Sequence, residues 1–412
     1  MSELERLIQE YCPNGVHFYE LGELGKFYGG LTGKSKDDFT DGNAKFITYK
    51  NVYSNPALRI DVEDRVKIAP DEKQRTLEYG DVIFTGSSET PDECGISSVL
   101  TEKSEEKLYL NSFCFVFRFN DLSIILPDFA KHLFRSSNLR YQIGKTASGV
   151  TRYNVSKKLM EKVVIPVPPI EVQGEIVRIL DNFTELTAEL TAELTARKKQ
   201  YEYYKESLLT FELVEYVPLG DVSNVVAGGT PSKKVPEYWK AGDIKWLGST
   251  VCKNQKTVDE VTNYITSLGL EKSSAKMMKK ETTLIALVGA TIGKVAFLPF
   301  EASINQNIAG IYPKDKNKLD PSYLYYACTM LYPKFFALTQ GSKLAMANLS
   351  FVRGLEIPLP SIDEQRRIAS ILDRFDALCN DISAGLPAEI EARQKQYEYY
   401  RDKLLTFKEA SE

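Results

Sequence analysis

Two glycine-rich segments that carry a lysine are the first candidates for chemistry in this chain. Gly289–Val295 (GATIGKV) and Gly29–Ser35 (GGLTGKS) resemble the phosphate-binding loop of nucleotide-binding enzymes. That loop needs four residues between its first glycine and the Gly-Lys pair, so that backbone N–H groups can surround the phosphate. Each segment is one residue short, and Val295 stands where a Ser or Thr is needed. We therefore expect tight glycine turns at strand ends and no nucleotide site.

Other catalytic patterns are also missing. His17 and His132 are the only histidines, and neither has a cysteine or another histidine nearby in the sequence. This argues against a zinc site and against a catalytic triad. The carboxylates in Pro70–Lys73 and Pro91–Glu93 lack the partner lysine of a nuclease site and are typical of surface turns. We expect His17 at a domain edge, His132 on a helix surface, and no catalytic, cofactor-binding or metal-binding residue in this chain.

Basic, aromatic and amide side chains in loops remain, and their chemistry suits DNA. Arg and Lys bind phosphates or guanine, and Asn and Gln can read adenine edges. Each single residue has a simpler interpretation without DNA: a lysine can be solvated, an asparagine can cap a helix, and a tryptophan can lie in the core. The clusters are therefore stronger evidence for DNA binding than any one residue. The candidates in the first half of the chain are Lys34, Lys36, Lys50, Arg59, Ser87, Lys145, Arg152, Tyr153 and Asn154. Those in the second half are Thr230, Ser232, Lys233, Lys234, Trp239, Lys245, Trp246, Lys253, Lys294, Asn305, Gln306, Asn307, Lys343 and Asn348.

Charge is distributed unevenly along the 412 residues, whose net charge is −4. Residues 219–360 hold 17 Lys and Arg against 11 Asp and Glu, and residues 15–165 hold 21 against 21. The segments 171–211 and 361–412 each have a net charge of −3. A nucleic-acid surface is therefore expected in the globular parts, and the acidic segments are expected to face a protein partner.

Cysteine usage and hydropathy favour a cytoplasmic protein. The N-terminal segment is acidic and amphipathic, unlike a signal peptide, and no apolar run approaches the roughly 18 residues of a transmembrane helix. The cysteines are scattered without paired spacing, which predicts reduced thiols instead of disulfides or zinc ligands. They are Cys12, Cys94, Cys114, Cys252, Cys328 and Cys379.

The elements that must position these candidates are organised around one long predicted helix, Glu171–Phe211. Its apolar and aromatic residues form two rows with a spacing of seven, which is typical of a coiled-coil seam. At about 1.5 Å per residue it would be roughly 60 Å long. A bundle helix inside one globular domain is the alternative. The residues predicted to pair the arms are Ile176, Leu180, Phe183, Leu190, Leu194, Tyr201, Tyr204, Leu208, Ile368, Leu372, Phe375, Tyr397, Tyr400 and Leu404.

The centre of this helix contains a four-residue repeat, TAELTAEL at Thr187–Leu194. Each added unit would lengthen a helix by about 6 Å and rotate it by about 40°. The repeat is predicted to adjust the length of the arm, with a solubilising low-complexity patch as the alternative. In the second arm, Gly385 and Pro387 predict two helices with a break between them.

Much of the chain occurs twice. Ala196–Tyr204 (ARKKQYEYY) matches Ala392–Tyr400 (ARQKQYEYY), and Ile165–Phe183 matches Ile357–Phe375. A period of about 195 residues is too long for a solenoid and suits two whole domains, each followed by a helical arm. The expected parts are a helical segment at 1–14, a first domain at 15–165, a central arm at 166–214, a second domain at 215–357 and a C-terminal arm at 358–412.

Each domain is expected to be mixed α/β, with a mostly antiparallel or irregular sheet and no regular βαβ alternation. The pattern predicts strands over 44–52, 64–69, 80–86 and 112–119, and helices over 128–147 and 321–341.

These features together resemble the DNA-specificity subunits of type I restriction-modification systems. The resemblance rests on the opening NGVHFYELGEL, the two IPxPxI segments followed by ILDxF, the two ARxKQYEYY segments and the TAEL repeat. It covers essentially the whole chain, strongly in the arms and weakly in the two domains, and is greatest for the subgroup with TAEL repeats. The arms are unequal, which leaves their pairing register open.

The resemblance implies a fold and a role. Two target-recognition domains would be separated by an antiparallel coiled coil, arranged by tandem duplication about a pseudo-twofold axis. Each would read half of a bipartite, asymmetric site in double-stranded DNA. The arms would set the spacing and dock two methyltransferase subunits, which bind S-adenosylmethionine, while restriction subunits supply ATP- and Mg-dependent translocation and cleavage. This chain itself would be non-catalytic and would bind no membrane.

Two other function classes remain open on the sequence. One is a coiled-coil scaffold that binds only proteins, and the other is an autonomous methyltransferase or nuclease. Sequence-specific DNA binding would separate the first from a DNA-recognition subunit. Methyl-donor binding by the isolated chain would support the second.

Overall fold

The long helix expected from the heptad rows is α7 (Ile170–Leu209), and it contributes to two separate folded units. In this computed structural model, which describes residues 2–258, 261, 263–339, 346–381 and 384–410, the first unit comprises 1–189 and 391–412. The second unit comprises 190–390. The second arm is divided as predicted, into α13 (Ile362–Asn380) and α14 (Leu386–Leu404).

The first unit contains the following elements besides its parts of α7 and α14. Its helices are α1 (Glu3–Tyr11), α2 (Leu21–Leu24), α3 (Tyr49–Ser54), α4 (Pro127–Leu133), α5 (Ser137–Gly144) and α6 (Lys157–Met160). Its strands are β1 (His17–Glu20), β2 (Gly25–Gly29), β3 (Ala44–Ile47), β4 (Arg65–Val66), β5 (Val82–Thr85), β6 (Ser87–Ser88), β7 (Ser97–Val99), β8 (Leu108–Leu110), β9 (Cys114–Phe119), β10 (Ala147–Gly149), β11 (Tyr153–Val155) and β12 (Val164–Val167).

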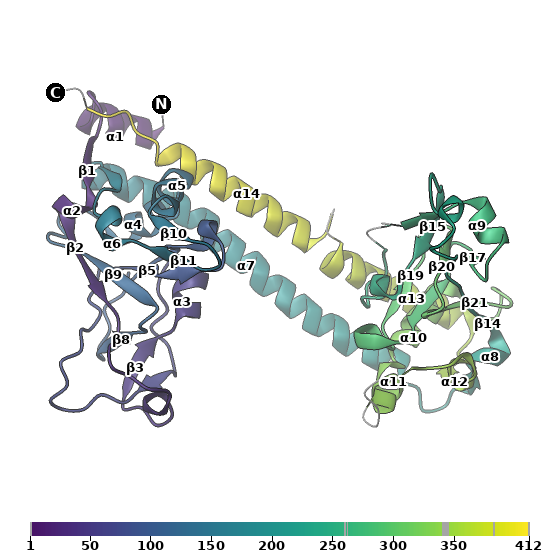
Figure 1. Ribbon diagram of the computed structural model, residues 1–412. Coiled ribbons are helices and arrows are strands. Elements are labelled where there is room, and N and C mark those ends of the chain that lie inside the picture. Colours follow the sequence, from purple (N-terminus) through teal and green to yellow (C-terminus); the bar gives the residue numbers. More distant parts are fainter. Residues whose placement is uncertain (1, 259–260, 262, 340–345, 382–383, 411–412) are drawn as a thin grey trace. The chain divides into compact units, whose positions relative to one another are not determined.

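A four-stranded antiparallel sheet, β2-β9-β5-β7, forms the centre of the first unit. Successive side chains of a strand point to opposite faces, so the continuous apolar runs of β5 and β9 are buried on both sides. Phe84 and Phe117 pack with the helices and the arm, whereas Ile83 and Val116 pack toward the sheet β4-β3-β8. Near the chain ends, the N–H of Val16 donates to the carbonyl oxygen of Lys408, and the segments after α1 and α14 lie side by side (Figure 1).

The second unit has a closely similar plan. Its helices, besides α13 and its parts of α7 and α14, are α8 (Leu219–Val222), α9 (Ser267–Glu271), α10 (Pro321–Thr329), α11 (Tyr332–Thr339) and α12 (Leu349–Gly354). Its strands are β13 (Tyr216–Pro218), β14 (Ser223–Ala227), β15 (Ile244–Leu247), β16 (Asn263–Ile265), β17 (Lys276–Met278), β18 (Thr283–Ala286), β19 (Val295–Phe297), β20 (Ala302–Ile304), β21 (Ile308–Pro313) and β22 (Glu356–Pro358).

The central sheet of the second unit is β14-β21-β18-β19, and β16-β15-β20-β17 is its second sheet. Ile285 and Ile311 face the helices and the arm, whereas Leu284 and Ile308 face the second sheet. The mixed α and β composition and the duplication expected from the sequence are therefore both present.

Four predicted elements were wrong in extent, and the strand expected over 64–69 is only β4 (Arg65–Val66). The strand expected over 44–52 ends at Ile47, because the Thr48 side chain accepts from the N–H of Asn51 and caps α3. The helix expected over 128–147 is α4 and α5, because Ser136 is extended (φ −66°, ψ 151°) and begins a new helix. The helix expected over 321–341 is α10 and α11. Pro333 lies in the first turn of α11, where its missing N–H is tolerated, but it could not continue α10.

Arm helices pack against one another within each unit, in the predicted antiparallel sense (Figure 1). In the first unit Phe183 of α7 stacks on Tyr400 of α14, with ring centroids 5.3 Å apart. In the second unit Tyr204 of α7 stacks on Phe375 of α13 at 5.4 Å. Among the predicted seam residues, Tyr204 and Tyr400 keep more than a third of their surface exposed. Those fully or largely buried are Ile176, Leu180, Tyr201, Ile368, Leu372 and Tyr397, and Phe183, Leu190, Leu194, Leu208, Phe375 and Leu404 are partly buried.

A buried glutamine fastens the arm to the domain in each unit. Gln173 of α7 accepts from the N–H of Leu126 at 2.8 Å and donates to the carbonyl oxygens of Ile124 and Pro168. Gln365 of α13 accepts from the N–H of Asp320 at 2.9 Å and donates to two carbonyl oxygens. Both glutamines are fully buried, and each side chain hydrogen bonds to three backbone groups.

A carboxylate two turns further along makes a second, equivalent attachment. In the first unit Asp181 bonds with Lys131 and with His132 Nε2, both at 2.8 Å. In the second unit Asp373 accepts from the hydroxyl of Tyr326 at 2.6 Å and pairs with Lys256. The two aspartates belong to the repeated ILDxF segments, and they hold α4 and α10 respectively onto the arm.

The prediction that His132 lies on a helix surface was wrong. Its side chain is 1% exposed, and its Nδ1 lies 2.9 Å from the hydroxyl of Tyr397. Burial lowers the pKa of His132, and the bond to Asp181 only partly opposes this. The ring is therefore a neutral member of the attachment between domain and arm.

Replacing Gln365 by leucine should destabilise the second unit. The change removes the hydrogen-bond partner of three backbone groups, at a cost of about 1–3 kcal/mol for each one that stays buried. Urea unfolding should show a midpoint well below that of the wild-type chain. Glu189→Ala, at an exposed position of α7, is the control and should unfold like wild type. An unchanged midpoint for Gln365→Leu would contradict the attachment.

Acidification should destabilise the first unit through His132. Because the folded pKa lies below the ordinary value of about 6.5, the unfolded chain takes up the proton first as the pH falls. This contribution to stability is thus intact above pH 6.5 and is lost progressively below it. Melting temperatures from pH 7.5 to 5 should fall less steeply for His132→Gln, which keeps a hydrogen-bond donor but does not titrate. Equal slopes for the two chains would refute the assignment.

Candidate nucleic-acid interface

In the first unit, β6, the β10–β11 hairpin, α3 and the turn before β9 meet around a cavity of about 580 Å³. It brings together two of the predicted residues, Ser87 and Arg152. Nε and Nη2 of Arg152 donate to the hydroxyl of Ser87 at 3.1 and 3.0 Å, and the guanidinium lies 5.9 Å from the ring centroid of Phe113. The same hairpin carries the predicted Tyr153 and Asn154.

The position of Arg152 depends on a tight turn between β10 and β11. Gly149 has a φ of +155°, and a Cβ at this residue would lie 2.0 Å from the carbonyl oxygen of Arg152. Only glycine fits without moving the turn.

Aromatic and acidic side chains also line the cavity. Tyr49 and Tyr53 of α3 stack on one another, with ring centroids 6.1 Å apart. The hydroxyls of Tyr53 and Ser88 each donate to Glu93 at 2.9 Å, and these hydrogen bonds lower the pKa of the Glu93 carboxyl. The cavity thus combines an exposed cation, an ionised carboxylate and aromatic faces, a combination suited to the edges of bases more than to phosphates.

In the second unit, the turn between β20 and β21 brings together another predicted group. The Thr230 hydroxyl hydrogen bonds to Oε1 of the exposed Gln306. Oδ1 of Asn305 accepts from the N–H of Asn307 at 2.9 Å and shapes the turn. Trp246 is buried, and its Nε1 donates to the carbonyl oxygen of Gly229, so this indole belongs to the core.

Of the remaining predicted residues, Trp239 lies edge-on against Trp246, with ring centroids 5.2 Å apart, and its Nε1 donates to the carbonyl oxygen of Ser232. Lys34 is held by Glu72 and the carbonyl oxygen of Lys67, and Arg59 pairs with Asp61. Asn348 caps α12 by accepting from the N–H of Phe351. The exposed residues are Lys36, Lys50, Lys145, Ser232, Lys233, Lys234 and Lys253, whereas Lys294 is partly buried. Lys343 lies outside the described residues.

Four residues that line the first cavity were not among the predicted DNA-binding candidates. Phe113, Tyr49 and Tyr53 lie in segments without a motif, and Glu93 belongs to Pro91–Glu93, which was expected to be a surface turn. A comparison of the two copies could have found Phe113, because Asn111 and Asn305 both precede a buried strand at the same position of the duplication.

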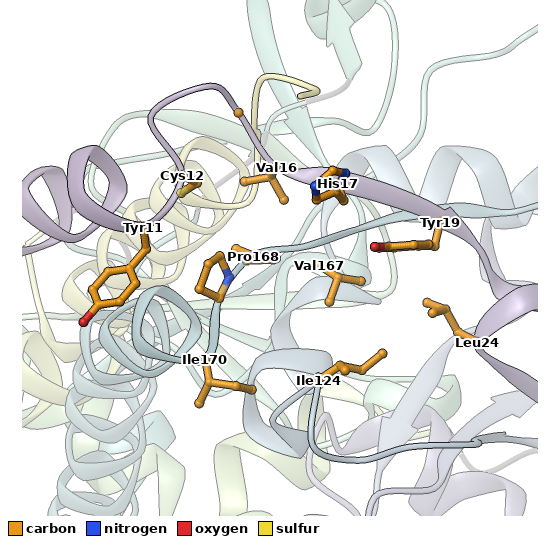
Figure 2. A pocket seen from close by; sticks show the side chains of 12 residues that line it. Tyr11, Cys12, Val16, His17, Tyr19, Leu24, Ile124, Val167, Pro168 and Ile170 are labelled. Atoms are coloured by element: carbon orange, nitrogen blue, oxygen red, sulfur yellow. The ribbon is translucent and has the colours of Figure 1, made fainter. Parts of the chain in front are cut away.

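A second cavity of the first unit, of about 470 Å³, lies between α1, β1, β12 and the start of α7. Figure 2 shows Tyr11, Pro168 and Ile170 at one end, and Tyr19 and Leu24 at the other. Burial raises the pKa of the Cys12 thiol on its wall, so this cysteine is not a poised nucleophile.

Within the described part of the chain, no cluster of three or more His, Cys, Asp or Glu side chains could hold a metal ion. All six cysteines are buried and free. In the same residues, no helix is both long enough and apolar enough to cross a membrane.

Comparison with known families gives two matches along this chain. The model described as the type I restriction modification DNA specificity domain matches residues 13–197 and again residues 212–392.

The curated relatives agree. The Escherichia coli type I restriction enzyme EcoR124I/EcoR124II specificity subunit is 40% identical over 265 residues, which are 61% of this chain and 65% of that protein. The chain thus matches just under two thirds of the length of this relative. A putative type I restriction enzyme specificity subunit of Haemophilus influenzae, S.HindORF215P, is 34% identical over 277 residues, covering 63% of this chain and 68% of that one.

Two solved structures share the fold. The crystal structure of the type I restriction-modification S subunit from M. genitalium has a TM-score of 0.56 at 14% identity, covering 95% of this chain and 96% of that one. A structure concerned with assembly and conformational transition of the type I R-M system has a TM-score of 0.62 at 18% identity, covering 95% and 98%. At these identities the likeness supports the fold alone.

Substituting Gly149 should loosen the hairpin that positions Arg152. Gly149→Ala places a methyl group against the carbonyl oxygen of Arg152, so residues 147–155 should exchange their amide hydrogens faster than in the wild-type chain. Gly144→Ala is the matched control, because a Cβ there meets no atom within 4 Å. Unchanged exchange over the hairpin in Gly149→Ala would contradict the role of this glycine.

Proposed function

The chain belongs to the family of type I restriction modification DNA specificity domains, and from this premise we propose that it is the DNA-recognition subunit of a type I restriction-modification complex. Each unit reads one half of a bipartite, asymmetric site in double-stranded DNA. The observation that carries this proposal is the duplication itself: two closely similar frames carry different polar side chains, Arg152 and Ser87 in the first unit and Gln306 and Thr230 in the second.

The proposed mechanism is direct readout by loops. Base edges in the major groove carry a donor and acceptor pattern that Arg, Gln and Asn side chains can distinguish, while lysines hold phosphates. The net charge of −4 is low for a protein that would wrap DNA alone. Partner subunits therefore supply part of the DNA-binding surface in this proposal.

Chemistry is assigned to the partners. Two methyltransferase subunits dock on the arms, bind S-adenosylmethionine and methylate adenine, which requires flipping the base out of the duplex. Restriction subunits use ATP and Mg to translocate and cleave. This chain acts without a catalytic residue of its own, and it works in the cytoplasm, as its free cysteines suggest.

The helical arms act as the spacer, and the chain is a member of the TAEL-repeat subgroup. α7 is one uninterrupted helix of 40 residues that carries the TAEL repeat in its central part. A helix converts the number of residues directly into distance, and recognition of two half-sites requires a defined separation along the duplex. In this proposal the domain boundaries at 14/15, 165/166, 214/215 and 357/358 separate reading elements from spacing elements.

A scaffold that binds only proteins is the competing function. Competition binding by the assembled complex separates the two: a recognition subunit binds one duplex sequence in the presence of excess random DNA, whereas a scaffold shows no such preference.

Duplicating one TAEL unit should change the spacing and nothing else. Four added residues lengthen α7 by about 6 Å, so the gap between half-sites should grow by about one or two base pairs. Sequencing of methylated DNA from cells that carry the altered complex measures this. Replacing one unit by the helix-forming sequence AAAA keeps the length and should leave the gap unchanged. Altered letters within either half-site would refute the spacer role.

A further inference from the structure

The internal duplication allows one unit to be compared with the other, position by position. In the first unit Oδ1 of Asn111 accepts from the N–H of Phe113 at 2.9 Å. In the second, Asn305 makes the same contact with Asn307 at 2.9 Å. The turns that precede β9 and β21 are therefore the same structure built twice.

The neighbouring backbone is also the same. The N–H of Gly86 donates to the carbonyl oxygen of Phe113 at 2.7 Å. In the second unit, the N–H of Leu287 donates to the carbonyl oxygen of Asn307 at 2.8 Å. Ser87 pairs with Asn154 across an antiparallel bridge, as Val288 pairs with Met346. Ser87 thus corresponds to Val288, and Asn154 to Met346.

On this shared frame the side chains at the tip differ. The first unit presents Phe113, which is 60% exposed, beside Arg152 and Ser87. In the second unit the residue that corresponds to Phe113 is Asn307, and Gln306, which corresponds to Ser112, hydrogen bonds to Thr230. Single exposed apolar or charged side chains are common on protein surfaces, so the informative feature is that the side chains differ while the surrounding backbone hydrogen bonds stay the same.

We propose that this frame is the base-reading element of each unit, with Arg152 reading guanine in one half-site and Gln306 reading adenine in the other. The inference rests on the proposed function. Ser87 and the Phe113 ring orient the guanidinium, so that its Nη1 and Nη2 edge can bind O6 and N7 of guanine. Gln306 keeps an amide nitrogen for N7 of adenine, and its Oε1 has a second lone pair for the adenine N6 amino group.

Glu93 favours base edges over phosphate as the target of this cavity. Its carboxylate is ionised and lines the same cavity as Arg152, so a phosphate there would meet a like charge. A base edge carries both acceptors and amino donors, and it can satisfy the cation without opposing the carboxylate.

The test uses the complete complex with its modification subunits, and the readout is the sequence of the methylated sites. Arg152→Ala should relax one guanine position in one half-site, lowering discrimination there about 5- to 150-fold, and should leave the other half-site unchanged. Gln306→Ala should relax an adenine position in the other half-site only. Arg65→Ala is the matched control, because Arg65 is an exposed arginine of the first unit that pairs with Glu106 and is not among the predicted DNA-binding residues, and its sites should equal those of wild type.

A variant that methylates nothing is resolved by binding measurements. Duplexes in which 7-deazaguanine replaces single guanines lack the N7 acceptor. When 7-deazaguanine replaces the guanine that Arg152 reads, the wild-type complex should bind less tightly. The Arg152→Ala complex should bind this duplex and the unmodified duplex with equal affinity. The inference would be overturned if every 7-deazaguanine replacement lowered the affinity of both complexes equally. It would also be overturned if Arg152→Ala methylated the same sites as wild type, or if its sequence preference relaxed in both half-sites together. A wild-type complex that methylates no bipartite site would instead overturn the proposed function.

Discussion

A buried carboxamide that joins a domain to a helix is the constraint on which each unit depends. Gln173 and Gln365 each satisfy three backbone groups at the point where the chain leaves the domain and enters the arm. Hydrogen bonds of this kind contribute modestly when made and cost considerably more when a buried partner is left alone. Asp181 and Asp373 add a second point of attachment two turns along the same helix. Each point makes several hydrogen bonds with preferred directions, so together they hold the domain in one orientation on its arm. A reading surface on such a domain keeps a fixed direction relative to the helix that carries it.

The two copies diverge where recognition is proposed and coincide where attachment is needed. The aspartate contact illustrates how attachment tolerates change: His132 and Tyr326 differ in chemistry, yet both reach the carboxylate at the end of a repeated ILD sequence. At the tip of each domain the backbone bonds recur and the functional groups do not. This division follows from the physics of the two tasks. Attachment of the domain to the arm requires that buried polar groups are hydrogen bonded. Recognition of a different DNA sequence requires different hydrogen-bond donors and acceptors on an unchanged backbone.

The sequence predicted the elements that depend on local periodicity and repetition. The long helix, the break near Gly385, the buried strands over 80–86 and 112–119, and the duplication all have signals within one stretch or between two copies. Failures arose where a tertiary contact or a single capping residue decided the outcome. Thr48 and Ser136 begin helices inside stretches whose composition favoured a continuous element. His132 was misplaced because its partners, Asp181 and Tyr397, are 49 and 265 residues away. The predicted site residues were chosen by side-chain type. Side-chain type alone does not distinguish the exposed Arg152 from Lys34, which pairs with Glu72, and only the fold shows this difference.

The central claim is that each domain alone determines the sequence of one DNA half-site, and that the arms determine only the distance between the two half-sites. An exchange tests it most directly: residues 215–357 are inserted in place of residues 15–165, and the methylated sites of the assembled complex are sequenced. The account predicts a symmetric site made of two inverted copies of the second half-site, with the original gap. Persistence of the first half-site in the exchanged protein would contradict it.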